Sequence, residues 1–348
     1  MNNRSLPLVH VVVLNYNGMR WLKDCFDSLR QSTYGNMEMV LLDNLSTDES
    51  VSYVQQNYPE VRIIQTGKNA GYSKAYNLAF EQCSGEYLVM LNNDVKVRPN
   101  WLEPMVQEAE SDPMIAAVAP KLLYMNDLTL FEYAGACGGH MDKYGYPFAR
   151  GRVFFTLEKD EGQYENNEDI FWVTGAAMFI RLAAIEKCGD LDADFVHHME
   201  EIDLCWRMQL AGFKLRVTPA SIVEHYGGAT IVPDSFKKTY WNHRNSIFML
   251  FKNLEGRNLP GILLKHLFLD ALAAAWYARN LKFNKVYAVL SAHVWIFVHL
   301  PMLWRNRKAA QAKRRVSDEV IFKTIFPKSI AIRYFLFGEK TYNQLLKK

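Results

Sequence analysis

The sequence lacks the features that mark several other classes of protein. Its five cysteines are scattered and none form a C-x-x-C pair, which argues against a disulfide framework or a structural zinc site and favours a reducing compartment. The formal net charge is only +3, too small to imply attraction to nucleic acid. The chain also lacks an internal repeat or a low-complexity tract.

The N-terminus lacks the long apolar core of a signal peptide. The apolar run after Arg4 holds only about six residues before Asn15 interrupts it, which is too short for such a core. We therefore expect the main domain to face the cytosol. With 348 residues, the chain can bury one full core and still carry an extension.

Between residue 9 and about residue 120, short apolar runs alternate with helical stretches, as in β-α-β units around a parallel sheet. We expect strands at 9–14, 39–43, 61–65, 87–91 and 115–119, and helices at 19–31, 48–57 and 71–83. Open sheets of this kind bind ligands beyond the carboxyl ends of their strands. Polar residues follow three of these ends, at 15–18, 43–46 and 92–94, and predict one shared site.

The next segment, 121–169, is rich in Gly, Tyr, Asn and charge and shows no sustained period, so we expect long loops over the crevice. Strands are then expected within 171–180 and at 217–223. An amphipathic helix is expected at 200–211, where Gly212 ends it.

Beyond about Ser235 the sequence changes to long helical stretches rich in Leu, Phe, Ala, Trp and Tyr. Residues 286–304 carry no charged side chain and approach the length needed to span a bilayer. Basic residues flank both ends, so the one-sided bias of a simple span is missing. We expect an in-plane helix pair on an anionic membrane surface. The alternatives are a helical subdomain packed on the core or on a dimer partner, and a true span.

Three segments at the predicted crevice can carry chemistry. Asp94 can hold Mg²⁺ or Mn²⁺ together with phosphates and water, because hard cations prefer carboxylate oxygen, although an Asn-Asp pair can also be an ordinary turn. Asp43 can accept from a nucleobase or ribose, or simply precede a capped helix. Residues 67–74 can cradle a phosphate at a helix N-terminus, or form a plain glycine turn.

Taken in order, these segments resemble glycosyltransferase family 2, and especially its bacterial rhamnosyltransferase-like members. The matching pieces lie at 13–18, 43–48, 69–77, 92–94, 173–176, 200–207, 225–228 and 244–245. The resemblance implies an α/β GT-A (Rossmann-like) domain with a mainly parallel sheet over residues 1–234. Its donor half would cover about 1–120 and its acceptor half about 121–234. The apolar and basic composition of residues 235–348 predicts a helical, membrane-associating extension after this domain.

The resemblance also implies roles for individual residues. The nucleotide-sugar donor would contact Asn15, Asn17, Asp43, Asn44, Asn69, Gly71, Lys74, Asn92 and Asn93. Asp94 would hold Mg²⁺ or Mn²⁺, and His225 would complete the metal or diphosphate site unless it is a loop histidine bonded to backbone. The family usually has Asp where this chain has Asn92, so the metal should bind more weakly here.

Glu201 matches the position of the family's catalytic base, which is usually Asp. A carboxylate near another carboxylate and phosphates can have a raised pKa that suits this role. Acidic residues also favour helix N-termini, so Glu200 and Asp203 belong either to the acceptor pocket or to the structure of the helix. Trp172 and Gly175 would line the sugar pocket or form an ordinary strand and turn, and Arg244 would meet a phosphate or pair with an acid.

The expected activity is inverting transfer of a sugar from a nucleotide-diphosphate donor, dTDP-L-rhamnose first and a UDP-hexose second. The acceptor would be a hydroxyl of a lipid-linked or polysaccharide glycan of the cell envelope, at the cytosolic face of the membrane. One rival is a nucleotidyltransferase that makes the sugar nucleotide, although its glycine-rich, basic N-terminal loop is missing. The other is a non-catalytic, membrane-associated nucleotide-sugar-binding protein. The sequence does not give the oligomeric state.

Overall fold

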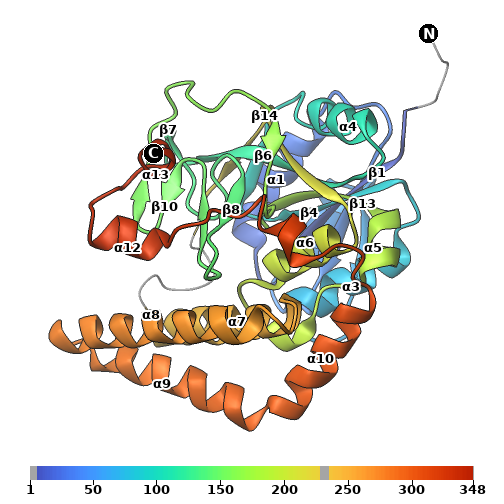
Figure 1. The fold of residues 1–348 in the computed structure, drawn as a ribbon. Helices are drawn as coiled ribbons and strands as arrows, with labels where there is room; N and C mark the ends of the chain where they lie inside the picture. The colour runs from blue at the N-terminus through green and yellow to red at the C-terminus, as the bar shows by residue number, and fades with distance from the viewer. Residues whose placement is uncertain (1–5, 228–234, 348) are drawn as a thin grey trace.

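The computed structural model describes residues 6–227 and 235–347 and centres on one large mixed sheet (Figure 1). The sheet has the order β12-β14-β6-β13-β4-β1-β2-β3. Its parallel half comprises β1 (Val9–Asn15), β2 (Met37–Asp43), β3 (Arg62–Gln65) and β4 (Tyr87–Asn92). The connecting helices are α1 (Met19–Arg30), α2 (Ser50–Asn57) and α3 (Tyr72–Gln82). The elements expected in this half are therefore confirmed, with small shifts at their ends.

The second half of the sheet mixes strand directions. Here β13 (Ala177–Arg181) runs antiparallel to both β4 and β6 (Ile115–Tyr124), whereas β14 (Lys214–His225) runs parallel to β6. The short strands β5 (Val95–Val97), β7 (Asp127–Phe131) and β12 (Glu168–Asp169) pair at its margins. Helices α4 (Leu102–Ser111), α5 (Leu182–Cys188) and α6 (Glu200–Leu210) and the 3₁₀ turn η1 (Ala193–Phe195) complete this half.

Strand β1 illustrates why the sheet is central. Its sequence is rich in valine, and its side chains alternate between the two faces of the sheet and are buried on both. Val11 and Val13 pack with α1, α2 and α4 on one face, whereas Val12 packs with α3 on the other. Burial on both faces is typical of a strand at the centre of a doubly covered sheet.

One expectation about the middle of the chain was wrong, and another was confirmed only in part. Residues 121–169 are not simply loops: β6 continues to Tyr124, and a separate four-stranded sheet follows. Its strands are β8 (Gly139–Met141), β9 (Pro147–Ala149), β10 (Arg152–Val153) and β11 (Thr156–Leu157), too short to give a readable period. Within 171–180, only the part from Ala177 onward is a strand of the sheet.

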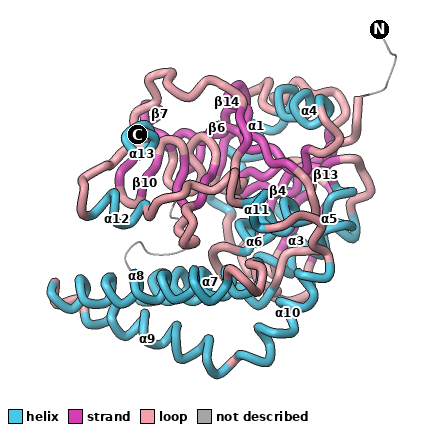
Figure 2. Tube along the Cα trace, viewed as in Figure 1, coloured by secondary structure: helices cyan, strands magenta, loops and turns pink. Residues whose placement is uncertain are grey.

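The C-terminal region is helical, and Figure 2 shows its long helices as a layer below the strands. It comprises α7 (Phe236–Asn253), α8 (Leu259–Arg279), α9 (Phe283–Val298), α10 (Leu300–Ala312), α11 (Asp318–Ile321), α12 (Ile330–Phe335) and α13 (Tyr342–Leu346). Residues from α7 to α13 share the core cluster on the α3 face of the sheet. The expected domain boundary at residue 234 lies outside the described residues.

The uncharged run 286–304 is not one straight helix. It breaks at His299, where α9 and α10 meet with a bend of 73°. Pro301 lies in the first turn of α10, where its missing N–H does not disrupt the helix. By length and composition, α8 is the one helix of the described chain that could cross a membrane alone, and α9 with α10 could do so only as a bent pair.

Candidate functional site

The carboxyl ends of β1, β2 and β4 meet at one edge of the sheet, as the sequence predicted. The strand registers place Asn15 beside Asp43 and Leu14 beside Asn92. Asn93 Nδ2 donates to Asn15 Oδ1 at 2.6 Å, and Asn15 Nδ2 donates to Ser46 Oγ at 3.0 Å. The three polar strand ends therefore form one hydrogen-bonded cluster.

The turn after β1 requires its particular residues. Asn17 has a positive φ of 51°, and its side-chain oxygen accepts from the backbone N–H of Thr47 at 2.7 Å. At Gly18, a Cβ atom would lie 2.0 Å from Asn93 Nδ2, so a larger residue there would displace the hydrogen-bonded side chain of Asn93. The carboxylate of Asp43, 2% exposed, accepts from the backbone N–H of Ser46. These contacts fix the shape of the predicted nucleotide-binding edge.

The loop before α3 is joined to the same cluster. Asn44 Nδ2 donates to Asn69 Oδ1 at 3.1 Å, and Asn44 Oδ1 accepts from the backbone N–H of Ala70 at 2.8 Å. Gly71 has a φ of 76°, and no side chain caps the N-terminus of α3. Lys74 is exposed in the first turn of that helix. Free N–H groups together with a nearby lysine are suited to phosphate oxygens.

Asp94 and His225 form a buried pair beside this edge. Strand β5 pairs with β14 so that Val95 lies opposite His225, and the backbone N–H of Tyr226 donates to Asp94 O at 3.0 Å. This ladder brings His225 Nε2 to 3.2 Å from Asp94 Oδ1. Asn92 Nδ2 lies 3.4 Å from the same nitrogen. Gly228, the last residue of the motif that begins at His225, lies outside the described residues.

A second acidic residue, which the sequence did not predict, lies behind His225. Glu132 is 1% exposed, and its Oε1 lies 3.3 Å from His225 Nδ1. The other oxygen of Glu132 accepts from the backbone N–H of Ala134 at 2.6 Å, which fixes the carboxylate. Burial lowers the pKa of His225, but the carboxylates of Glu132 and Asp94 outweigh burial and raise it to about 10.

The donor atoms of this pair fit a divalent cation only in part. Asp94 offers carboxylate oxygen, and His225 offers an imidazole nitrogen once an arriving cation displaces the proton that its raised pKa otherwise retains. Both donor types bind Mn²⁺, although Mg²⁺ prefers oxygen alone. Among residues 6–227 and 235–347, no group of three or more His, Cys, Asp or Glu side chains could hold a metal ion by itself. Phosphate oxygens and water would therefore have to complete the coordination sphere.

Glu200 and Glu201 begin helix α6. Burial raises the pKa of both carboxyl groups, and the charge of Glu201 raises that of Glu200 further. Glu200 Oε2 is buried and accepts no hydrogen bond from the described residues. Two acids with raised pKa values, a buried Glu200 and a half-buried Glu201, can hold a proton near neutral pH and exchange it with a ligand.

Helix α3 and the turn at Gly175 connect this acidic pair to the nucleotide edge. Tyr72, the first residue of α3, donates its hydroxyl to Gly175 O at 2.9 Å. A Cβ atom at Gly175 would lie 2.4 Å from the Tyr72 hydroxyl oxygen and 3.8 Å from Glu201 Cβ. The predicted base is therefore next to the turn that precedes β13, and close to the start of α3.

The backbone before α6 is strained, and the Arg-Asn motif at 244–245 holds it in place. Val196, His198 and Met199 all have positive φ values, between 65° and 70°, which is unusual for residues other than glycine. Asn245 Nδ2 donates to the carbonyl oxygens of His197 and His198, each at 2.6 Å. Arg244 donates to the carbonyls of Asp194 and Phe195, and pairs with no carboxylate of residues 6–227 and 235–347. The motif thus orients the helix that carries Glu201.

Two residues expected near the acceptor are deeply buried. Asp203 is 0% exposed and pairs with Arg207 and Lys252 at 2.8 Å each, which ties α6 to α7. Trp172 packs on Gly139, and its indole N–H donates to His140 O at 2.8 Å. In this structure both side chains support the core, and their contact with an acceptor stays a prediction.

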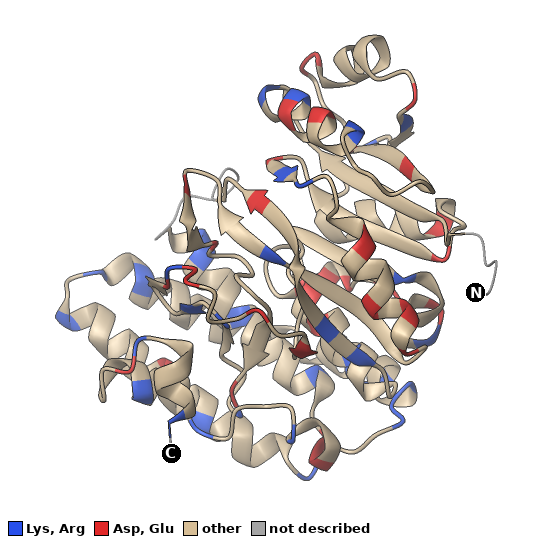
Figure 3. Ribbon diagram, turned by 90° about the horizontal axis from the view of Figure 1, so that it is seen from above, with Lys and Arg blue, Asp and Glu red and all other residues tan. Residues whose placement is uncertain are grey.

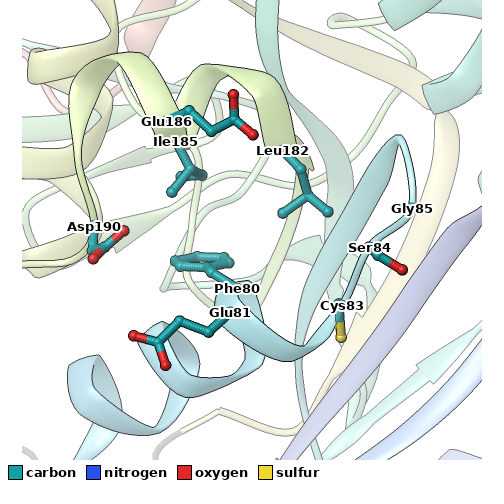
Figure 4. A pocket seen from close by; sticks show the side chains of 9 residues that line it. All are labelled: Phe80, Glu81, Cys83, Ser84, Gly85, Leu182, Ile185, Glu186 and Asp190. Carbon is teal, nitrogen blue, oxygen red and sulfur yellow. The ribbon is translucent and has the colours of Figure 1, made fainter.

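A surface hollow of about 380 Å³ lies elsewhere (Figure 4). Its walls include Phe80, Leu182 and Ile185, next to the amino end of β4 and therefore opposite the polar strand ends. Its charged residues are Glu81, Glu186 and Asp190, which would repel a diphosphate. This hollow is a poor candidate for the donor site.

Comparison with known proteins settles the family. The model of the family described as "Glycosyl transferase family 2" matches residues 10–187, just over half of the 348 residues. The chain belongs to glycosyltransferase family 2. As a family-2 chain it is a glycosyltransferase that acts on a nucleotide sugar, and its curated relatives include a rhamnosyltransferase.

Two of these relatives come from bacteria. The N-acetylglucosaminyl-diphospho-decaprenol L-rhamnosyltransferase of Mycobacterium tuberculosis is 25% identical over 255 residues, which cover 69% of this chain and 83% of that protein. The O-antigen biosynthesis protein RfbC of Myxococcus xanthus is 27% identical over 243 residues, covering 68% of this chain and 19% of that protein.

Solved structures confirm the GT-A fold of this family-2 chain. GalNAc-T7 with UDP, GalNAc and Mn²⁺ has a TM-score of 0.57 and 18% identity, covering 72% of this chain and 48% of that one. The mannosyltransferase PcManGT of Pyrobaculum calidifontis, solved with GDP-Man and Mn²⁺, has a TM-score of 0.51 and 14% identity. The match covers 88% of this chain and 86% of that one. Both structures therefore hold Mn²⁺ together with a nucleotide or nucleotide sugar.

Proposed function

We propose that this glycosyltransferase inverts the anomeric centre of its sugar and transfers it to a hydroxyl of a lipid-linked or polysaccharide acceptor. The observation that carries the proposal is the acidic pair at the start of α6, held beside Gly175 and Tyr72 at the nucleotide edge of the sheet. An enzyme that transfers sugar to a hydroxyl in one step needs a base at the acceptor and a separate site for the leaving diphosphate.

In this mechanism Glu201 takes the proton of the acceptor hydroxyl. The hydroxyl oxygen forms a bond to the anomeric carbon as the bond between that carbon and the diphosphate oxygen breaks. The electron pair of the broken bond leaves with the nucleoside diphosphate, so no sugar-enzyme bond forms. Glu200, which is 5% exposed and has an oxygen that accepts no hydrogen bond from the described residues, keeps a proton, and the half-buried Glu201 is the group that ionises first.

Asp94 and His225 would hold Mn²⁺ or Mg²⁺ with the donor's diphosphate. When bound, the ion supplies positive charge that stabilises the departing diphosphate. The side chain of Asn92, which lies against His225, adds an amide where the family usually has a carboxylate. Asn15, Asn17, Asp43, Asn44, Asn69, Gly71, Lys74 and Asn93 form the rest of the proposed donor edge.

Our first candidate donor is dTDP-L-rhamnose, followed by a UDP-hexose. Support comes from the mycobacterial relative, whose name gives L-rhamnose as the sugar and a diphospho-decaprenol as the lipid. Such an acceptor would place the enzyme at the cytosolic face of the cell membrane, in assembly of a cell-envelope glycan.

A donor panel tests the proposal. Purified enzyme is given each nucleotide sugar, Mn²⁺ or Mg²⁺ and a lipid-linked acceptor extract, and nucleoside-diphosphate release is measured. NMR of the product then gives the anomeric configuration. We expect release with one donor class and an inverted product, and a retained configuration would overturn the mechanism. Release of pyrophosphate from a nucleoside triphosphate would instead favour a nucleotidyltransferase.

A further inference from the structure

Helix α9 has one face that nothing in the described chain covers. Its outward side chains recur every three or four residues, as on one face of a helix, and their exposed fractions run from 55% to 76%: Phe283, Tyr287, Leu290, Val294 and Phe297. The opposite face is made of Ala288, Val289 and Ala292, which are buried where α9 packs mainly on α7. Exposed apolar stripes of this size mark interaction surfaces.

Helix α8 repeats the pattern. Its exposed apolar side chains lie four residues apart: Leu264, Phe268, Leu272 and Trp276. Its inner face, which includes Ile262 and Leu269, is buried in the core. The turn that joins the two helices adds Leu281, which is 77% exposed.

The C-terminal segment extends this surface. Phe335, Leu336 and Phe337 are exposed at the end of α12. The ring of Phe335 lies 6.4 Å from that of Trp276, so the segment continues the stripe of α8. A groove between α8 and α12 is lined by Phe268 and Phe337 and edged by Lys265 and Lys328.

The charges that flank the α9 stripe have one sign. Residues 271–317 contain Lys and Arg at both ends of the α9 stripe and no Asp or Glu. Elsewhere on the fold, acidic and basic residues are interspersed (Figure 3). An apolar stripe bordered by cations matches the boundary between hydrocarbon and anionic headgroups in a bilayer.

A buried cluster argues that α8 does not cross the membrane. Asp270, on its inner face, lies 2.8 Å from His243 Nδ1 of α7 and accepts from the Tyr146 hydroxyl at 3.1 Å. His293 Nε2 of α9 lies 3.3 Å from the other oxygen of Asp270. A spanning α8 would break these contacts and place Asp270 in hydrocarbon, where an ionisable group is costly.

We infer that the outer faces of α8 and α9, together with Phe335–Phe337, form a membrane-docking surface that lies in the plane of a bilayer containing anionic lipids. The inference deepens the proposed function and rests on it for one consequence only, the delivery of lipid-linked acceptors to the crevice. Helix α9 of the docking surface packs on α7. The ion pair between Lys252 and Asp203 then joins α7 to α6, the helix that carries Glu201.

Vesicle flotation of the full-length protein tests the surface. The wild type should float with vesicles that contain phosphatidylglycerol, and less with phosphatidylcholine alone. The double change Leu290→Ser and Phe297→Ser should lower the partition coefficient about ten-fold or more, because two large apolar groups leave the interface. The matched control, Met114→Ser with Leu128→Ser, removes two exposed apolar side chains on other elements and should float as the wild type does.

Two further readouts separate the alternatives. The fluorescence of Trp276, taken as the difference between the wild type and Trp276→Phe, should be quenched by brominated lipids. Lipids brominated near the headgroup should quench it more than lipids brominated deep in the acyl chain. Stronger deep quenching would overturn the in-plane placement. Failure of the wild type to float would overturn the docking surface, and a dimer that Phe297→Ser dissociates would show that a second copy covers it.

The docking surface and the catalytic proposal can fail separately. The Leu290→Ser and Phe297→Ser variant should keep wild-type turnover on a water-soluble acceptor. Loss of flotation with turnover retained assigns the α9 face to docking. Flotation of a wild-type protein that shows no donor turnover would refute the proposed function and leave the docking surface standing.

Discussion

Replacing Glu201 by Gln should slow sugar transfer by about 10²–10⁴-fold, the usual contribution of a general base. At about 1.36 kcal/mol per decade, the barrier would rise by about 3–5 kcal/mol. Gln keeps the shape of the side chain and its place beside Gly175, so the donor should still bind. The loss should therefore fall on kcat for transfer, with little change in the dissociation constant of the donor.

The pH profile makes this prediction specific to a base. Burial raises the pKa of Glu201 above its ordinary value. The carboxylate is the active form, so wild-type kcat/KM should rise with pH through a pKa well above the ordinary glutamate value of about 4.3. In Glu201→Gln this acid limb should disappear together with most of the rate.

Glu200→Gln is the matched control. Glu200 is the member of the pair expected to keep its proton, and a neutral Gln imitates that protonated state. This variant should retain the acid limb and most of the rate. The reasoning would be refuted by equal losses in the two variants, or by an acid limb that persists in Glu201→Gln.

Three further measurements, one of them again on Glu200→Gln, test the site and its surroundings. Glu132→Gln should weaken Mn²⁺ binding in the presence of nucleoside diphosphate by about 10–100-fold, because it loosens the orientation of His225. Calorimetry measures this affinity, and an unchanged value would contradict the role of Glu132. Asn245→Ala should lower kcat by about 10²-fold without changing donor affinity, because the strained segment before α6 loses its support. An equal loss of donor binding would argue for general unfolding instead. Glu200 has a raised pKa in the folded state, so its contribution to stability is complete below about pH 4.3 and is lost as pH rises. Glu200→Gln should therefore raise Tm more at about pH 9 than at about pH 5. An equal change in Tm at both pH values would contradict the buried proton.

The parallel half of the sheet was predictable because its strands are buried on both faces and end in polar turns. Asn15, Asp43 and Asn92 could therefore be brought to one edge from spacing alone. The short strands between Gly139 and Leu157 were missed because two or three residues carry no readable period. The break at His299 was missed because an apolar run does not reveal where a helix bends.

Residues that support the site were the hardest to predict. Glu132 belongs to a segment expected to form loops, and only the pairing of β5 with β14 and the fold of that segment bring it to His225. Arg244 and Asn245 were recognised as a motif, but their carbonyl partners depend on a strained turn that no local pattern indicates. Tyr72 gave no signal beyond its place at the start of a helix.

The central claim is that the donor's diphosphate and its metal ion bind at the carboxyl ends of β1, β2 and β4. Anomalous diffraction from crystals grown with Mn²⁺ and a nucleoside diphosphate tests it most directly. The account predicts a manganese peak within coordination distance of both Asp94 and His225 Nε2, with the diphosphate beside it. A peak among Glu81, Glu186 and Asp190, or a diphosphate bound with no peak near Asp94, would contradict it.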